Sequence, residues 1–188
     1  MRKITRTYTD PLDLVWLHAA RRMGMRVVRS AEVNASWDGA GVLTIGTPET
    51  LDPDDCLAQM ILHETCHALV EGPECLTQLD WGLLNNPAKK VHEHACLRLQ
   101  AALANRVGLR QFFASTTMFR AYYDQLPAEP LAAGDDPAIA MAQAGWQRAT
   151  EGPWADALDE ALRRTAEIAR AVDGVTSEDS LWHGPGLD

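Results

Sequence analysis

Apolar residues recur along most of this chain at intervals of three or four positions, the spacing that places them on one face of a helix. In the most apolar of these stretches, Pro53 stands in an aspartate-rich turn where a helix can start, and Gly72 and Pro73 are the usual signals for its end. Because this stretch is apolar on most sides, we expect it to be enclosed by the rest of the protein. The whole pattern predicts helices at 12–23, 53–71, 89–108, 111–126, 138–150 and 154–172.

Between the first two predicted helices, short runs of β-branched and apolar residues predict strands at 25–28, 32–37 and 42–45. The sequence Asp-Gly-Ala-Gly at 38–41 is typical of a hairpin turn between the second and third strands. The third strand, Val42–Ile45, could lie at an edge of the sheet or in its interior. This order of elements predicts an α+β fold, in which a small mixed sheet packs on the enclosed helix and on the next one, with further helices toward the C-terminus.

Proline and glycine residues at 127–130 and 134–137 indicate a linker. We therefore expect one domain at 1–126, followed at 127–188 by the linker and a helical appendage that packs on the same domain.

Composition and charge exclude some classes of partner. The 188-residue chain has a net charge of -9 and no basic cluster that offsets it, so we expect no nucleic-acid partner. The chain has no apolar run of membrane-spanning length and no signal-type segment after its basic N-terminus, so we expect no membrane partner and a cytoplasmic location. In that compartment the four cysteines, Cys56, Cys66, Cys75 and Cys96, should be reduced.

The pentapeptide His63-Glu64-Thr65-Cys66-His67 in the enclosed helix carries the chemistry of the chain. Residues four apart lie above one another in a helix, so His63 and His67 can direct their imidazoles at one metal ion. This H-E-x-x-H spacing is typical of a zinc site in which the glutamate, here Glu64, is the general base. Such groups are costly to bury without partners, which also favours a bound ion. The alternative is a chance occurrence of the pattern in a metal-free helical binding domain.

A catalytic zinc ion takes three ligands from protein and leaves one position for water. Glu93 and His94 are the candidates in the next helix, and because they are adjacent, only one should face the ion. With a glutamate on this second helix the sequence resembles the gluzincins, the zincin branch that includes thermolysin, and most closely the compact ImmA/IrrE-type and BlaR-type peptidases. On this resemblance we prefer Glu93 to His94. Leu97 stands where that family has a polar residue, so the hydrogen bond that orients a ligand histidine must come from elsewhere.

The resemblance implies a zincin-like fold and a zinc-dependent metallopeptidase. Zinc held by His63, His67 and Glu93 would polarise a peptide carbonyl and activate the water for which Glu64 is the base. The substrate would be a peptide or protein, added as a strand at an edge of the sheet. Leu97 favours an alternative, in which a zincin-fold regulatory module binds a protein partner and has little or no peptidase activity.

Other residues carry separate hypotheses. Cys75, in the loop after the metal helix, could compete with water for the zinc. Trp81 could floor a substrate pocket, although we prefer a role in covering the core. Tyr122 or Tyr123 could donate a hydrogen bond to an oxyanion, although aromatic residues at helical spacing usually belong to a core. His183 could complete an inhibited zinc site as a fourth ligand.

Overall fold

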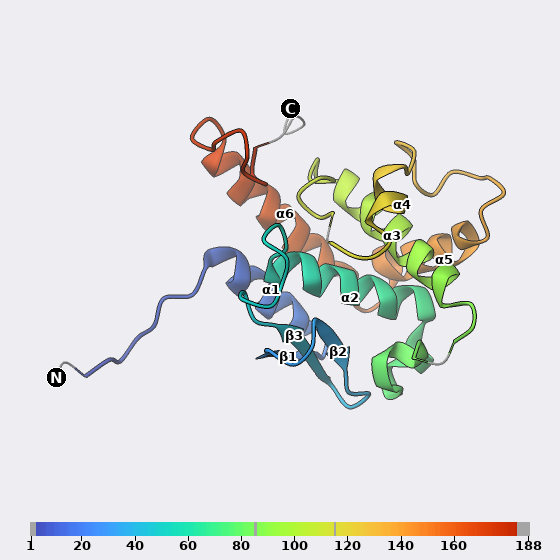
Figure 1. Cartoon of the computed structure of the whole chain (residues 1–188), viewed down its shortest axis with the longest axis horizontal. Coiled ribbons are helices and arrows are strands. Elements are labelled where there is room, and N and C mark those ends of the chain that lie inside the picture. Colours follow the sequence, from blue (N-terminus) through green and yellow to red (C-terminus); the bar gives the residue numbers. More distant parts are fainter. Residues whose placement is uncertain (1–2, 85, 115, 184–188) are drawn as a thin grey trace.

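The computed structural model describes residues 3–84, 86–114 and 116–183. Within these residues the chain is a mixed α+β structure with a small three-stranded sheet, which confirms the α+β class and the small sheet that the sequence predicts. Figure 1 shows α2 between the sheet and the helices α3 and α5, and an N-terminal segment that extends away from the body. None of the helices in the described part of the chain is long and apolar enough to cross a membrane. In chain order the elements are α1 (Pro11–Arg22), β1 (Arg26–Ser30), β2 (Ala35–Trp37), β3 (Val42–Gly46), α2 (Leu57–Glu71), the short 3₁₀ helices η1 (Pro73–Thr77) and η2 (Leu79–Gly82), α3 (Lys89–Asn105), α4 (Arg120–Asp124), α5 (Ala138–Glu151) and α6 (Ala155–Val172).

The sheet has the strand order β1-β3-β2, with β1 parallel to β3 and β2 antiparallel to it. The hairpin turn between β2 and β3 forms as predicted, and the carboxylate of Asp38 accepts hydrogen bonds there from the main-chain N–H groups of Ala40 and Val42. Of the two positions considered for 42–45, the interior is confirmed and the edge is wrong, because β3 has a strand on each side. One edge of the sheet is therefore β2.

Helix α2 is buried from Leu57 to Val70. It packs against α1, α3 and α5, and its apolar residues form one continuous core with those helices. At Gly72 the backbone has a φ of 91°, in the left-handed region that favours glycine, and the helix ends there as predicted. Polar side chains on α2 are therefore held in the protein interior.

The start of α2 differs from the prediction. The helix begins at Leu57, so the predicted start near Pro53 is wrong. The chain instead makes a turn in which the N–H of Asp55 donates to the carbonyl of Asp52 at 2.9 Å. Cys56 takes the cap position, and its main-chain N–H donates to the side-chain oxygen of Gln59. The aspartates that favour a helix start are used in this turn and not in the first turn of the helix.

The C-terminal helices pack on the same core. Gly145 on α5 allows close contact with α2 and α3, since a methyl group there would lie 2.9 Å from Leu99 and 3.2 Å from Val70. Helix α6 lies along α1, where the buried indole N–H of Trp16 donates to the hydroxyl of Thr165 at 3.0 Å. The boundary between two units at residue 126 stays a prediction.

Residues 111–126 do not form the single helix that their aromatic residues predict, and among the residues of this segment that the structure describes, only α4 is helical. Side-chain amides from α2 and α3 bind the main chain of this segment. Gln59 on α2 donates to the carbonyl of Phe112 at 2.7 Å, and Gln100 on α3 donates to the carbonyl of Phe113. Those carbonyls are thereby taken from the hydrogen bonding of a regular helix.

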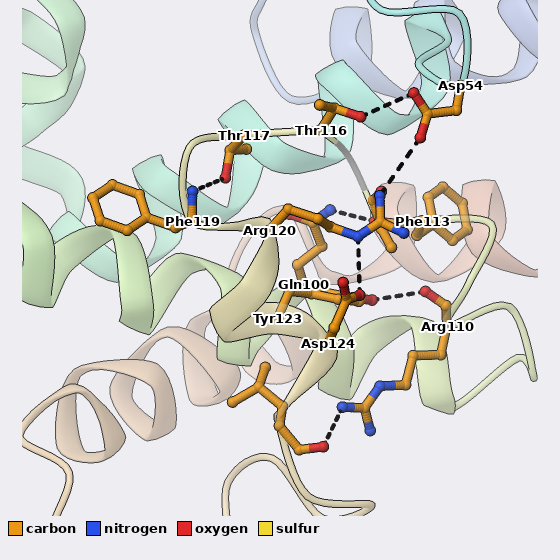
Figure 2. Close-up of polar contacts among 12 residues, drawn as sticks. Asp54, Gln100, Arg110, Phe113, Thr116, Thr117, Phe119, Arg120, Tyr123 and Asp124 are labelled. Atoms are coloured by element: carbon orange, nitrogen blue, oxygen red, sulfur yellow. Dashed lines mark hydrogen bonds and ion pairs between the residues drawn. The ribbon is translucent and has the colours of Figure 1, made fainter.

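Polar contacts also attach this segment to the start of α2, as Figure 2 shows. The hydroxyl of Thr116 donates to Asp54 at 3.1 Å, and the guanidinium of Arg120 lies 3.7 Å from the other oxygen of that carboxylate. Arg120 also pairs with Asp124 at 2.9 Å within α4. The described part of this segment therefore contacts the turn before α2 and packs on α3.

Candidate metal centre

Helix α2 places His63, Glu64 and His67 in the interior, with 6%, 8% and 4% of their surfaces exposed. The two histidines lie one turn apart, and their Nε2 atoms are separated by 3.2 Å. Two nitrogen ligands on a tetrahedral zinc ion, with bonds of about 2.0 to 2.1 Å, are about 3.3 Å apart. The imidazoles therefore have the separation that one shared zinc ion requires.

Helix α3 brings Glu93 to the same place. Its Oε2 lies 3.4 Å from Nε2 of His67, which again matches the distance of about 3.3 to 3.5 Å expected between two ligands of one tetrahedral zinc ion. Burial raises the pKa of Glu93, but the hydrogen bond and charge of His67 outweigh burial and bring the pKa to about 2. Glu93 is thus a carboxylate at neutral pH and can serve as an anionic ligand.

The two histidines differ in proton affinity. Burial and the neighbouring His67 lower the pKa of His63. Burial also acts to lower the pKa of His67, but Glu93 and Glu64 together raise it above its ordinary value. The carboxylates therefore favour a positive charge at His67, which a metal cation can supply as well as a proton.

Gln100 orients His63. Its Oε1 lies 2.9 Å from Nδ1 of His63, while its amide nitrogen donates to the carbonyl of Phe113. Because an amide oxygen only accepts, Nδ1 carries the hydrogen and Nε2 keeps a free lone pair for a metal. Nδ1 of His67, by contrast, has no hydrogen-bond partner among the described residues.

Gln100 is the polar residue that the sequence analysis missed. It follows Glu93 by seven positions, or two helical turns, and so lies on the same face of α3. That spacing is the signal that could have identified it. Leu97, by contrast, packs with Tyr123 in a small apolar cluster.

Cys96 offers a second donor set. His63, His67 and Cys96 are all buried, and one ligand atom from each lies within 4.8 Å of the others. The thiol, however, lies 3.6 Å from Nδ1 of His63, whereas the contact to His67 uses Nε2. Sγ also donates to the main-chain carbonyl of His63 at 3.4 Å. Burial and the neighbouring Cys66 raise the pKa of the Cys96 thiol well above its ordinary value, so the thiol is protonated at neutral pH in the metal-free chain.

The structure separates the two candidates on α3. The ring of His94 stacks on Tyr122, with ring centres 3.5 Å apart, and not on the α2 histidines. His92 pairs with Glu71 through Nδ1 at 2.6 Å. Of the three neighbouring residues, Glu93 is the one that contacts His67.

Glu64 is bound by the loop that follows α2. The indole N–H of Trp81 donates to Oε2 of Glu64 at 2.7 Å, and the Trp81 ring stacks on Trp37 with centres 4.5 Å apart. The preferred role of Trp81 in covering the core is confirmed, since only 3% of its surface is exposed. Its contact with Glu64 has no signal in the sequence, because the residues are 17 apart and on different elements.

Four residues of the other hypotheses make their hydrogen bonds elsewhere. The thiol of Cys75 donates to the carbonyl of Ala68, and burial followed by the charge of Glu71 raises its pKa to about 12. Tyr122 donates to Asp136 at 2.7 Å, and Tyr123 donates to the carbonyl of Arg110 at 2.8 Å. His183 lies beside Thr176, with Nδ1 3.5 Å from its hydroxyl.

A cavity of about 290 Å³ adjoins the C-terminal half of α2, but its lining does not include the α2 histidines or their glutamate. Comparisons with protein-family models, curated proteins and solved structures find no match to this chain. The geometry of the centre is therefore the basis for inferring a function.

Proposed function

We propose that this chain is a zinc-dependent hydrolase, a metallopeptidase of zincin type with the ligand set of the gluzincins. One observation carries the proposal. Nε2 of His67 lies 3.2 Å from Nε2 of His63 and 3.4 Å from Oε2 of Glu93. Each separation matches that of two ligands on a tetrahedral zinc ion, and three such donors in a protein interior are costly without a partner.

The side chains around the centre have separable roles in peptide hydrolysis. A zinc ion bound there would lower the pKa of a water molecule and polarise the substrate carbonyl. Glu64 takes the proton from the attacking water and returns it to the leaving nitrogen. Gln100 keeps the hydrogen of His63 on Nδ1. Nε2, which faces His67, therefore has a lone pair that can bind a metal.

The free edge of β2 supports an extended peptide as substrate. Asn34 and Asp38 bond to β3 through their main chains. Because antiparallel strands alternate, Ala35 and Trp37 direct their N–H and C=O groups away from β3, where an extended peptide can pair with them once the N–H of Trp37 is released from the Asp80 carboxylate that accepts its hydrogen bond. This edge is connected to the centre, since Trp37 stacks on the tryptophan that binds Glu64.

Glu64→Gln tests the proposal. The amide can still accept the bond from Trp81 but is no base, so the zinc-loaded variant should bind one zinc per chain and cleave nothing in a peptide library analysed by mass spectrometry. His67→Ala should lose the zinc, and exposed Glu32→Gln is the matched control that should cleave like wild type. Cleavage by the Glu64→Gln variant would refute the role of this base.

The burial of the centre favours a second candidate function, a zincin-fold module that binds a partner and has little or no peptidase activity. Glu64 is 8% exposed and its carboxylate is already hydrogen-bonded. In the same peptide-library assay, this module would bind zinc but leave every peptide intact in the wild type as well.

A further inference from the structure

The turn Gln78–Gly82, which we call the latch, contacts both parts of the proposed site. Its Asp80 carboxylate accepts a hydrogen bond from the main-chain N–H of Trp37 at 2.9 Å. Its Trp81 donates to Glu64 at 2.7 Å. One short turn thus binds the free edge of β2 and the carboxylate of the base.

The backbone of the latch is strained at these two residues. Asp80 has a φ of 44° and Trp81 a φ of 58°, in the left-handed region that residues other than glycine rarely adopt. Such conformations persist only where surrounding contacts enforce them, and they concentrate at functional sites. The turn also lies against the β2–β3 hairpin, where a methyl group at Gly39 would lie 3.1 Å from the main chain of Gln78.

We propose that the latch is an autoinhibitory element, which must lift from β2 and from Glu64 before a peptide can enter. This inference rests on the proposed peptidase function. The N–H of Trp37 is a group that an added strand would use, and Asp80 occupies it. Glu64 must reach the attacking water, and Trp81 both covers it and holds one of its oxygens.

The contacts that hold the latch to the rest of the site are the hydrogen bonds from Trp37 and Trp81, the stacking of their rings and the burial of the Trp81 ring in the core. Lifting the turn would release the strain at Asp80 and Trp81 and would expose the Trp81 ring. A peptide pairing with β2 would replace the bond to Asp80, so the substrate itself favours the open form.

Hydrogen exchange at indole groups tests the latch without any measurement of catalysis. In zinc-loaded protein labelled with ¹⁵N-tryptophan, Trp81→Phe and Trp16→Phe identify two of the indole signals. The N–H of Trp16 is the internal reference, because it is fully buried and bonded to Thr165 in the core. We expect the Trp81 N–H to exchange at least tenfold faster than the Trp16 N–H.

Two variants of Asp80 form a matched pair. Asp80→Asn keeps an acceptor for Trp37 and tolerates the left-handed backbone, whereas Asp80→Ala loses the acceptor and adds strain. Asp80→Ala should accelerate exchange of the Trp81 N–H roughly tenfold, without changing that of Trp16, and should raise kcat/KM for a peptide by a similar factor. Asp80→Asn should resemble wild type in both measurements.

Exchange of Trp81 in step with Trp16 would overturn the latch, and so would an Asp80→Ala variant that loses kcat/KM while exchange is unchanged. The proposed function fails separately. If the Trp81 N–H exchanges rapidly, and faster still in Asp80→Ala, in a chain that cleaves no peptide, that outcome supports the latch and contradicts the peptidase. Cleavage by a chain in which Trp81 exchanges only with the core supports the peptidase and contradicts the latch.

Discussion

Nδ1 of His63 lies 2.9 Å from Oε1 of Gln100, 37 positions further along the chain. This hydrogen bond joins the two helices of the proposed zinc site and fixes which imidazole nitrogen can bind a metal. The amide of Gln100 is itself held by the carbonyl of Phe113, so the irregular segment after α3 contributes to the orientation of His63.

Gln100→Leu should weaken zinc binding by about 10- to 100-fold, the range typical of losing a residue that orients a ligand histidine. The physical reason is that Nδ1 of His63 loses its acceptor and the ring can rotate. Competition with a chromogenic chelator measures the affinity, and Gln111→Leu on the exposed surface is the control. Equal zinc affinity in the Gln100→Leu variant and the wild type would show that this bond does not orient a ligand.

Glu93→Gln should weaken zinc binding by more than the roughly 100-fold expected for loss of an orienting residue, because it removes an anionic ligand. His94→Gln should bind zinc like wild type, since His94 stacks on Tyr122. Cys96→Ala should also retain zinc, because the Cys96 thiol contacts His63 on the Nδ1 side. Loss of zinc in Cys96→Ala with retention in Glu93→Gln would replace the proposed donor set with the one that contains sulfur.

Asp55→Asn should raise the melting temperature at pH 7.5 by a few degrees. Burial raises the pKa of the Asp55 carboxyl to about 6. The hydrogen bond from the Thr116 N–H acts to lower this pKa, and the negative charges of Asp54 and Asp52 act to raise it. In unfolded chains this pKa is about 3.9. The folded state therefore holds more protons between about pH 4 and 6, and ionised Asp55 costs stability above that window.

The gain from Asp55→Asn should shrink as the pH falls through 6 toward 4, where wild-type Asp55 becomes protonated in the folded state. The amide still accepts the bond from Thr116 at this position. Thermal unfolding of both chains across this range measures the effect, with exposed Asp135→Asn as the control. A difference in melting temperature that does not vary with pH would contradict the assigned pKa.

Thr165→Val should destabilise the protein by about 1 to 3 kcal/mol, because it leaves the buried indole N–H of Trp16 without an acceptor. Thr165→Ser keeps the hydroxyl and should lose less, so the two variants separate the hydrogen bond from the packing. Urea unfolding gives both values. If the valine variant were as stable as the serine variant, the contact between α1 and α6 would not depend on this bond.

The helices and strands with local signals are the ones that the sequence predicts. Apolar periodicity identifies α1, α2, α3, α5 and α6, and glycine marks the end of α2 and the β2–β3 turn. The predictions for the start of α2 and for the segment 111–126 are wrong because contacts with residues far away in the sequence determine the structure there. Gln59 and Gln100 bind carbonyls that a helix would use, and no local pattern reveals this.

The candidate site divides in the same way. His63 and His67 lie one turn apart in the same helix and Glu64 is next to His63, so helical spacing alone brings the three residues together. The choice between Glu93 and His94 depends on how α3 is rotated against α2, which adjacent residues cannot indicate. Trp81 reaches Glu64 from a turn in which two residues adopt a left-handed backbone, a conformation that composition does not predict.

Zinc K-edge X-ray absorption on the zinc-loaded chain tests the central claim most directly. One zinc held by His63, Glu93 and His67 predicts nitrogen and oxygen neighbours at about 2.0 to 2.2 Å and no sulfur. A sulfur neighbour at about 2.3 Å, or a folded chain that binds less than one zinc in excess metal, would contradict it.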